Sequence, residues 1–324
     1  MKKYLSALLL ALPLLAPSAA SAQAAAYPSK PLRWVVPYAA GGGSDFLART
    51  IGQALAARIG QPVIIDNKPG GNTSIGASDV ARSPGDGYTV LSADNGTLVF
   101  NPVLYKSLTY NATKDFTPVT LMGRFPMILV VNPGFGVNSA KEFIAKAKAE
   151  PGALSFASAG AGSPHHLAME LLNTEAGLSM VHVPYRGAAP ALGDVVSGQV
   201  PAMMVDYAAG AAFIRSGKLK PLAVAHASRL AQLPDVPTFA ELGYKSVEAA
   251  ALVGMVAPAS TPADIVATLN KRVVESIKDP EVHKRLVEFG VEPVGSTAAE
   301  YAELLRTESQ RWHKLIRDLN ITLD

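Results

Sequence analysis

The sequence predicts an α/β fold built from two similar units, and three observations carry this prediction. Short apolar runs alternate with segments of helical periodicity, a pattern typical of parallel strands covered by helices. The alternation begins near residue 32 and starts again at the apolar run 127–133. Beyond residue 262 the chain is mostly helical, so we expect this tail to add helices to an existing unit and not to build a third.

The first unit opens with a predicted buried strand at 32–38, which reads LRWVVPY. A helix follows, in which apolar residues from Leu47 to Ile59 recur every four positions and so lie along one face. Two further strands are expected at 62–67 and 88–93, with a short helix between them. This order of elements is that of a parallel sheet with covering helices.

The second unit repeats the pattern. Its strands are expected at 127–133, 153–159, 180–185, 201–206 and 220–227, with helices between them. Ser139 followed by Glu142 is a capping-box signature and predicts the start of the first of these helices. One more apolar strand, at 252–261, precedes the helical tail.

Two units and a returning tail are arranged most simply as two lobes joined by two crossings. The chain is expected to cross near residue 125 and to return near residue 250. Lobe 1 then comprises 27–125 plus 250–324, and lobe 2 comprises 126–249. Two crossings make a hinge, and a cleft between lobes is a common place for a small-molecule site.

Residues 1–22 have the layout of a secretory signal peptide: a basic start, an apolar core, and Ala20 and Ala22 at the spacing of a cleavage site. The core is interrupted by Pro13 and is too short for a stable membrane span. We therefore expect export to the periplasm. The chain has no cysteine, so its core must hold it without disulfides. Its 29 basic and 26 acidic residues form no basic stripe, which argues against nucleic acid as a partner.

Three consecutive glycines, Gly41 to Gly43, lie between the first strand and the first helix. The first N–H groups of a helix are unpaired and its dipole makes that end positive, while glycine has no Cβ to hold a ligand away. Such a loop suits a carboxylate or a phosphate. A tight turn without a ligand is an equally simple interpretation. Ser44 or Asp45 is expected to cap the helix, and Asp45 is more plausibly a cap or loop organiser than a base.

Small polar loops recur after the other strands. They lie at 69–76, 92–100, 157–166, 184–190 and 205–210. In open α/β sheets, ligands bind outside the carboxyl ends of the strands. A set of such loops shared by two lobes therefore predicts a ligand site. In the third loop, Ser163 is expected to cap a helix that starts with Pro164.

Motifs of other chemistries are absent: no Walker A loop, no G-x-S-x-G elbow and no H-E-x-x-H. His165 and His166 are adjacent and diverge on a helix, so we expect them to face the cleft or solvent and not to bind a metal. His182 is expected to be a satisfied strand histidine. Arg186 could pair with a ligand carboxylate or form a salt bridge. We expect no catalytic residue, metal or cofactor.

The segment YPSKPLRWVVPYAAGGGSD resembles the start of the Bug family, the TctC-like extracytoplasmic solute receptors of tripartite tricarboxylate transporters. The family pattern is proline, aromatic, two residues, two glycines, two residues and aspartate, and Pro37 to Asp45 match it completely. Further segments resemble later parts of the family, at 63–91, 157–172, 182–200 and 216–243.

This resemblance implies a type II periplasmic-binding-protein fold, a Venus flytrap whose two lobes close on an organic acid in the cleft. Loops of lobe 1 would hold one ligand carboxylate through backbone amides and waters. The implied ligand-binding residues of lobe 1 are Tyr38, Ala40, Gly41, Gly42, Ser92, Asp94 and Asn95. Those of lobe 2 are Ser158, Gly160, Gly162, Ser163, His165, Asp206 and Tyr207.

The leading hypothesis is a periplasmic receptor, expected to be a monomer. It would deliver a mono-, di- or tricarboxylate, possibly an aromatic one, to a membrane permease with large and small subunits. One alternative is a sensor that signals to a membrane kinase. Another is a periplasmic hydrolase, for which the sequence offers no nucleophile with an oriented base. The residues do not rank the candidate acids.

Overall fold

The computed structural model describes residues 27–323, and the predicted signal peptide lies outside the described residues. The strands are β1 (Leu32–Val36), β2 (Val63–Asn67), β3 (Thr89–Asp94), β4 (Phe116–Val131), β5 (Ser155–Ser158), β6 (Val181–Pro184), β7 (Ala202–Asp206), β8 (Lys220–Val224), β9 (Ala250–Pro258) and β10 (Glu292–Pro293). The α-helices are α1 (Gly43–Ile59), α2 (Ser74–Ala81), α3 (Asn101–Leu104), α4 (Ala140–Ala149), α5 (Pro164–Ala176), α6 (Ala188–Ser197), α7 (Tyr207–Arg215), α8 (Ala263–Ile277), α9 (Pro280–Phe289) and α10 (Ala298–Asp318). Two short turns complete the set, the π-helical η1 (Gly96–Phe100) and the 3-10 turn η2 (Pro133–Phe135).

The strands form one continuous sheet in the order β2-β1-β3-β9-β4-β7-β5-β6, with β10 and β8 also paired to β4. We call lobe 1 the part built on β1, β2, β3 and β9, and lobe 2 the part built on β5 to β8. The parallel pairing expected within each unit is confirmed for β1 with β2 and β3, and for β5 with β6 and β7. The joint between the units is antiparallel, because β4 leaves lobe 1 and β9 returns to it.

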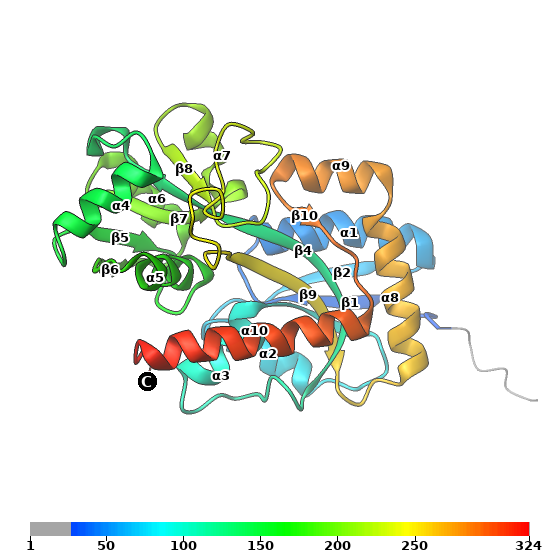
Figure 1. The fold of residues 1–324 in the computed structure, drawn as a ribbon. Coiled ribbons are helices and arrows are strands. Elements are labelled where there is room, and N and C mark those ends of the chain that lie inside the picture. Colours follow the sequence, from blue (N-terminus) through cyan, green and yellow to red (C-terminus); the bar gives the residue numbers. More distant parts are fainter. Residues whose placement is uncertain (1–26, 324) are drawn as a thin grey trace, which may run out of the picture.

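Strand β4 runs through both lobes (Figure 1). Its residues up to Pro126 pair with β9, and those from Met127 onward pair with β7 and β8. The strand predicted at 127–133 is only the second half of this element. Pro118, Gly123 and Pro126 resemble strand breakers in sequence, but register shifts accommodate Pro118 and Gly123 within the pairing, and Pro126 lies at its end.

The sheet of lobe 1 is covered on both faces. Leu32, Trp34 and Val36 of β1 point into a core shared with α1, α8 and α9, whereas Val35 points to the opposite core, which includes residues of α2 and α10. In Figure 1, α10 runs beneath the sheet and ends beside α3. These contacts place the tail helices on lobe 1. Within residues 27–323, no helix has the length and apolar character needed to span a bilayer.

Candidate functional site

The glycine loop leads directly into helix α1. The helix begins at Gly43, and its N-cap is Gly42, in an extended conformation with no side-chain cap. The expectation of Ser44 or Asp45 as the cap was therefore wrong. The first hydrogen bond within the helix runs from Phe46 N to Gly42 O, at 2.9 Å. The preceding N–H groups of this turn are consequently available to a ligand.

Asp45 organises this loop from inside the protein. Its carboxylate is 3% exposed and accepts hydrogen bonds from Gly41 N at 2.9 Å, Arg49 Nε at 3.0 Å and Asn67 Nδ2 at 3.0 Å. Burial raises the pKa of Asp45, but these donors outweigh it and the pKa is lowered. The prediction of a loop organiser is confirmed, and the amide of Gly41 is thereby used within the chain.

The glycines of the loop serve different needs. A Cβ on Gly41 would meet nothing within 4 Å, and one on Gly42 would meet only Ala39 O at 3.9 Å. A Cβ on Gly43 would lie 3.0 Å from the Phe125 ring of β4, so this glycine permits close packing. Gly41 and Gly42 thus present bare backbone to open space. Ala40, beside them, is also exposed.

Ser44, predicted only as a possible helix cap, is a further candidate for a ligand contact. Its Oγ is buried and has no hydrogen-bond partner within the described chain. It lies in the first turn of α1, next to the unpaired N–H groups. The sequence signal that could have found it is a hydroxyl directly after a glycine triplet at a helix start.

Tyr38 and Asp94 are paired behind the loop. The Tyr38 hydroxyl donates to Asp94 Oδ2, and Asp94 Oδ1 accepts from the backbone N and the hydroxyl of Thr97, each at 2.8 Å. Burial, then the charge of Asp94, raise the pKa of Tyr38 well above its usual range. The hydrogen bond between these two predicted residues therefore joins the chain just after β1 to the end of β3.

Ser92 and Asn95 support the same strand ends from within. Ser92 Oγ accepts from the Trp34 indole at 2.9 Å. Asn95 bridges to the returning strand, because its Nδ2 donates to Ala250 O at 2.9 Å and its Oδ1 accepts from Leu252 N at 3.3 Å. Both side chains are 1% exposed. Their ligand contact stays a prediction, whereas their bonds within the protein are in place.

The corresponding loop of lobe 2 is built around histidines. Ser163 caps α5 by accepting from His166 N at 3.3 Å, which confirms the predicted cap. Gly162 N donates to His166 Nδ1 at 3.1 Å. Ser158 is fully buried, with its Oγ 2.6 Å from His182 Nε2 and 3.1 Å from Gly160 N. The loop is thus fixed by bonds to its own neighbours.

Two adjacent histidines of lobe 2 are interior residues. His165 and His166 are 9% and 4% exposed, so solvent does not surround them. The His166 ring stacks on His182 with centroids 3.7 Å apart, and His182 stacks on Phe156 at 5.0 Å. Burial and the neighbouring His166 lower the pKa of His182 to about 4. The prediction that His182 is a satisfied strand histidine is confirmed.

His165 and Asp206 meet at the ends of β7 and the start of α5. His165 Nε2 lies 3.3 Å from Asp206 Oδ2, but neither ring nitrogen has an aligned hydrogen-bond partner within the described chain. Asp206 Oδ1 accepts from Ala209 N at 3.0 Å and so caps α7. Burial raises the pKa of Asp206, but His165 and this amide outweigh it and the pKa is lowered.

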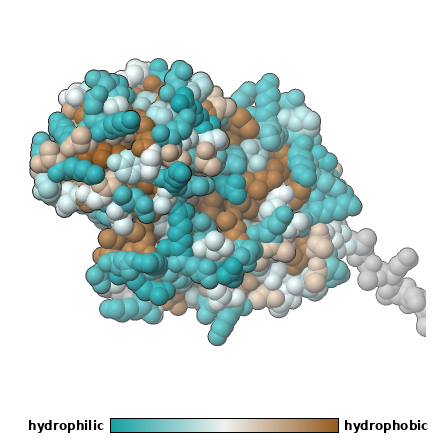
Figure 2. All heavy atoms as spheres, in the orientation of Figure 1, coloured by the Kyte–Doolittle hydropathy of each residue, from teal (hydrophilic) through white to brown (hydrophobic). Residues whose placement is uncertain are grey.

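The two loops of lobe 2 touch lobe 1. A Cβ on Gly162 would lie 2.5 Å from Leu104 Cδ1 and 3.0 Å from Leu323 Cδ1. A Cβ on Gly290, which follows α9, would lie 2.9 Å from Tyr207 Cδ1. Tyr207 therefore packs on bare backbone of lobe 1. Figure 2 shows hydrophobic atoms gathered in the recessed band between the rounded mass at the upper left and the rest of the molecule.

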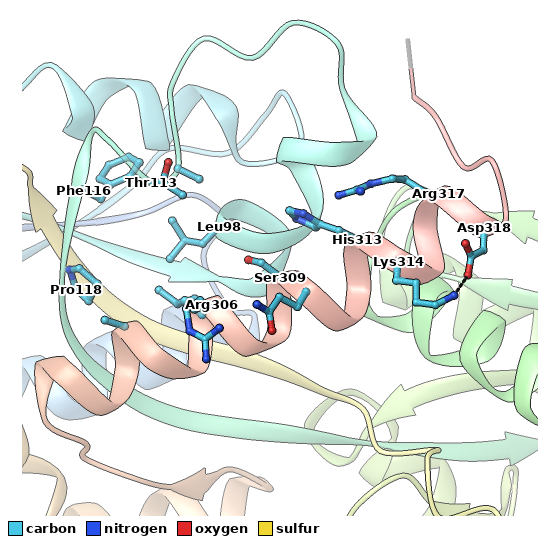
Figure 3. A pocket seen from close by; sticks show the side chains of 14 residues that line it. Leu98, Thr113, Phe116, Pro118, Arg306, Ser309, His313, Lys314, Arg317 and Asp318 are labelled. Carbon is cyan, nitrogen blue, oxygen red and sulfur yellow. Dashed lines mark hydrogen bonds and ion pairs between the residues drawn. The ribbon is translucent and has the colours of Figure 1, made fainter.

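A second hollow lies along α10, with a volume of about 760 Å³ (Figure 3). Basic side chains of α10 line it, including Arg306, Lys314 and Arg317, and Lys314 is paired with Asp318. None of the predicted ligand-binding residues lines this hollow. Within residues 27–323, no three acidic, histidine or cysteine side chains are grouped so that they could hold a metal ion.

Comparison with known proteins assigns the family. A family model described as "Tripartite tricarboxylate transporter family receptor" matches residues 47–321. The chain belongs to this receptor family. It is 34% identical to the protein BugT of Bordetella pertussis over 306 residues, which cover 94% of each chain.

Solved structures of the receptor family share the fold of this member. The Rhodopseudomonas palustris protein Rpa4515 with adipate superposes with a TM-score of 0.83 at 34% identity, covering 90% of this chain and 97% of that one. MatC of the same organism, with bound malate, gives a TM-score of 0.79 at 33% identity, covering 90% and 100%. The predicted two-lobed α/β fold of periplasmic binding proteins is thereby confirmed.

Proposed function

We propose that this chain captures a small organic carboxylate between its lobes in the periplasm and delivers it unchanged to the membrane subunits of a tripartite tricarboxylate transporter. The observation that carries the proposal is the glycine loop. Gly41 and Gly42 leave open space where a side chain would lie, and although the Gly41 amide is used by Asp45, the first N–H groups of α1 lack helical partners. Family membership and the adipate and malate held by relatives support a carboxylate as the ligand.

The mechanism follows from where these donors lie. A carboxylate would accept from the first-turn N–H groups of α1, at the positive end of the helix dipole. The lobes would then turn about the crossings of β4 and β9, near Pro126 and Ala250. Closure would hold the loops around Ser163 and Tyr207, which already contact lobe 1, over the ligand. Removing water from these charge-assisted bonds strengthens them, so ligand and closure stabilise each other.

A hydrolase is less well supported. It would need an exposed nucleophile with an oriented base. Ser158 does contact His182, but Ser158 is fully buried, and the pKa of His182 is lowered to about 4 by burial and by His166. A histidine of that pKa is a weak base near neutral pH. A sensory role would use the same closure to engage a membrane kinase. No feature of the described residues favours that role.

The test is a thermal-shift screen of the purified protein against organic acids, followed by chromatographic recovery of the ligand. An acid at 100 times its dissociation constant adds about 2.7 kcal/mol to the free energy of unfolding, which is readily visible. We expect hits confined to carboxylates, recovered unchanged. Conversion of the acid would contradict the receptor assignment, and stabilisation by non-acidic solutes alone would contradict the ligand class.

A further inference from the structure

The second lobe carries a buried polar pair that its own bonds do not satisfy. His165 is nine-tenths buried, and both of its ring nitrogens lack a hydrogen-bond partner within the described chain. Its Nε2 is 3.3 Å from Asp206 Oδ2. Buried polar groups of native proteins are nearly always hydrogen-bonded, so His165 Nδ1, which has neither a hydrogen bond nor the contact that Nε2 makes with Asp206, points to a bond that forms with the ligand.

This pair lies beside a contact between the two lobes. Tyr207, the residue after Asp206, packs on Gly290. Phe289, the residue before Gly290, stacks on Phe46 with ring centroids 3.6 Å apart. Phe46 belongs to the first turn of α1. A ligand whose carboxylate sits on α1 would therefore extend its far end toward Asp206 and His165.

Asp206 is the acidic member of the His165–Asp206 pair. The pKa of Asp206 is lowered, because its contacts with His165 and Ala209 N outweigh the effect of burial, so the side chain is an ionised acceptor near neutral pH. Asp206 Oδ1 accepts one hydrogen bond from Ala209 N, and a carboxylate offers about four lone-pair sites, so acceptor sites remain for a ligand donor. Arg186, a cation on the loop after β6, is exposed and forms no ion pair with Asp206 within the described chain. A second ionised carboxylate on the ligand would meet like charge here.

We propose that the His165–Asp206 pair receives the far end of the ligand and selects a hydrogen-bond donor there. The preferred ligand is then a carboxylic acid that ends in a hydroxyl or an ammonium group, in preference to a dicarboxylate of the same length. This inference rests on the proposed function and narrows its ligand class. It sets the chain apart from the relatives that hold adipate and malate.

Titration calorimetry with ligands of matched length tests the inference. One set is 6-hydroxyhexanoate, 6-aminohexanoate and adipate, and a shorter set is 4-hydroxybutyrate, 4-aminobutyrate and succinate. We expect the wild-type protein to bind a donor-ended acid at least ten times more tightly than the diacid of the same set. Asp206→Asn should remove this preference, and because asparagine also caps helices well, the variant should fold.

Asp235→Asn is the matched control, since it removes the same charge from an exposed position of lobe 2. It should leave the preference unchanged. Tighter binding of the diacid by the wild-type protein would overturn the inference while leaving the carboxylate receptor intact. An unchanged preference in Asp206→Asn would also overturn it. Failure of every carboxylate in a wider screen would instead overturn the proposed function, and this inference with it.

Discussion

The glycine loop before α1 and the glycine loop before α5 look alike in sequence but differ in what their glycines do. At Gly41 and Gly42, an added Cβ would meet open space or a single distant oxygen. At Gly160 it would lie 3.3 Å from Tyr185 O, and at Gly162 it would lie 2.5 Å from Leu104 Cδ1. The first loop uses glycine to expose backbone, and the second uses it to pack against protein.

The loops also differ in how they are anchored. The first is held by an ionised carboxylate, Asp45, which gathers three hydrogen bonds. The second rests on imidazole rings, because Ser158 bonds to His182 and His182 stacks on His166. Substitutions should therefore change ligand affinity at the first loop and stability at the second, and acid should loosen the two loops over different pH ranges.

The largest effect is expected for Gly162→Ala. The new Cβ would press on the buried Leu104, and the backbone φ of +73° is unfavourable for alanine. Together these should cost about 2 to 3 kcal/mol of unfolding free energy, measured by urea titration. Gly152→Ala is the control: its φ is +77° but its Cβ would meet nothing within 4 Å, so about 1 kcal/mol is expected. Equal losses at the two sites would refute the packing role.

For Gly42→Thr we expect a loss of ligand affinity with little change in stability, the reverse of Gly162→Ala. The position has an extended backbone, and threonine is about as good an N-cap as glycine, so stability should stay within about 0.5 kcal/mol. The side chain would cover the first-turn N–H groups and compete for them. Carboxylate affinity should fall by about 2 kcal/mol, roughly 30-fold, by titration calorimetry. Full affinity with unchanged stability would show that the ligand does not approach this backbone.

A smaller effect is expected for Asp45→Asn, which tests the anchor of the first loop. Loss of the charge-assisted bonds to Gly41 and Arg49 should cost about 1 to 2 kcal/mol at pH 7. Because the folded pKa of Asp45 is lowered, its contribution is complete above the unfolded value of about 3.9 and is lost as the pH falls through the folded value. Urea unfolding at pH 7 and pH 3 should therefore show a smaller difference in unfolding free energy between the wild-type protein and Asp45→Asn at pH 3.

The last prediction concerns the anchor of the second loop and is an effect of pH. The folded pKa of His182 is about 4, below the ordinary value of 6.5, so the unfolded chain binds more protons between these values. Stability should fall as the pH drops from 6.5 toward 4, before the loss from Asp45 sets in. His182→Phe keeps a ring in the stack and should flatten this part of the pH profile. An unchanged profile would mean that another group titrates there.

The sequence predicted what local patterns determine and missed what tertiary contacts decide. The Ser163 cap could be predicted because the serine accepts its hydrogen bond from His166 N, within the first turn of the helix that it caps. The prediction of the α1 cap was wrong because the Asp45 carboxylate accepts hydrogen bonds from Gly41 N and from Asn67. Asn67 lies on β2, which the local sequence around Asp45 does not reveal. The burial of His166 depends on His182, which a later strand brings alongside.

The first half of β4 shows the same limit. Its prolines and glycine break the alternation that marks a strand, and pairing with β9 and β10 from far along the chain holds it extended. For the candidate site, the glycine triplet and the strand-end loops were visible in the sequence. The open space at Gly41 and Gly42, the unpaired Ser44 hydroxyl and the His165–Asp206 contact were not, because each depends on which elements surround it.

A crystal structure of the protein with the tightest-binding acid from the screen tests the central claim most directly. The account predicts that a ligand carboxylate oxygen lies at hydrogen-bond distance, about 2.7 to 3.1 Å, from the N–H groups at the start of α1, with its carbon chain between the lobes. A carboxylate bound elsewhere, for example among the basic side chains of the hollow along α10, with the glycine loop unoccupied, would contradict it.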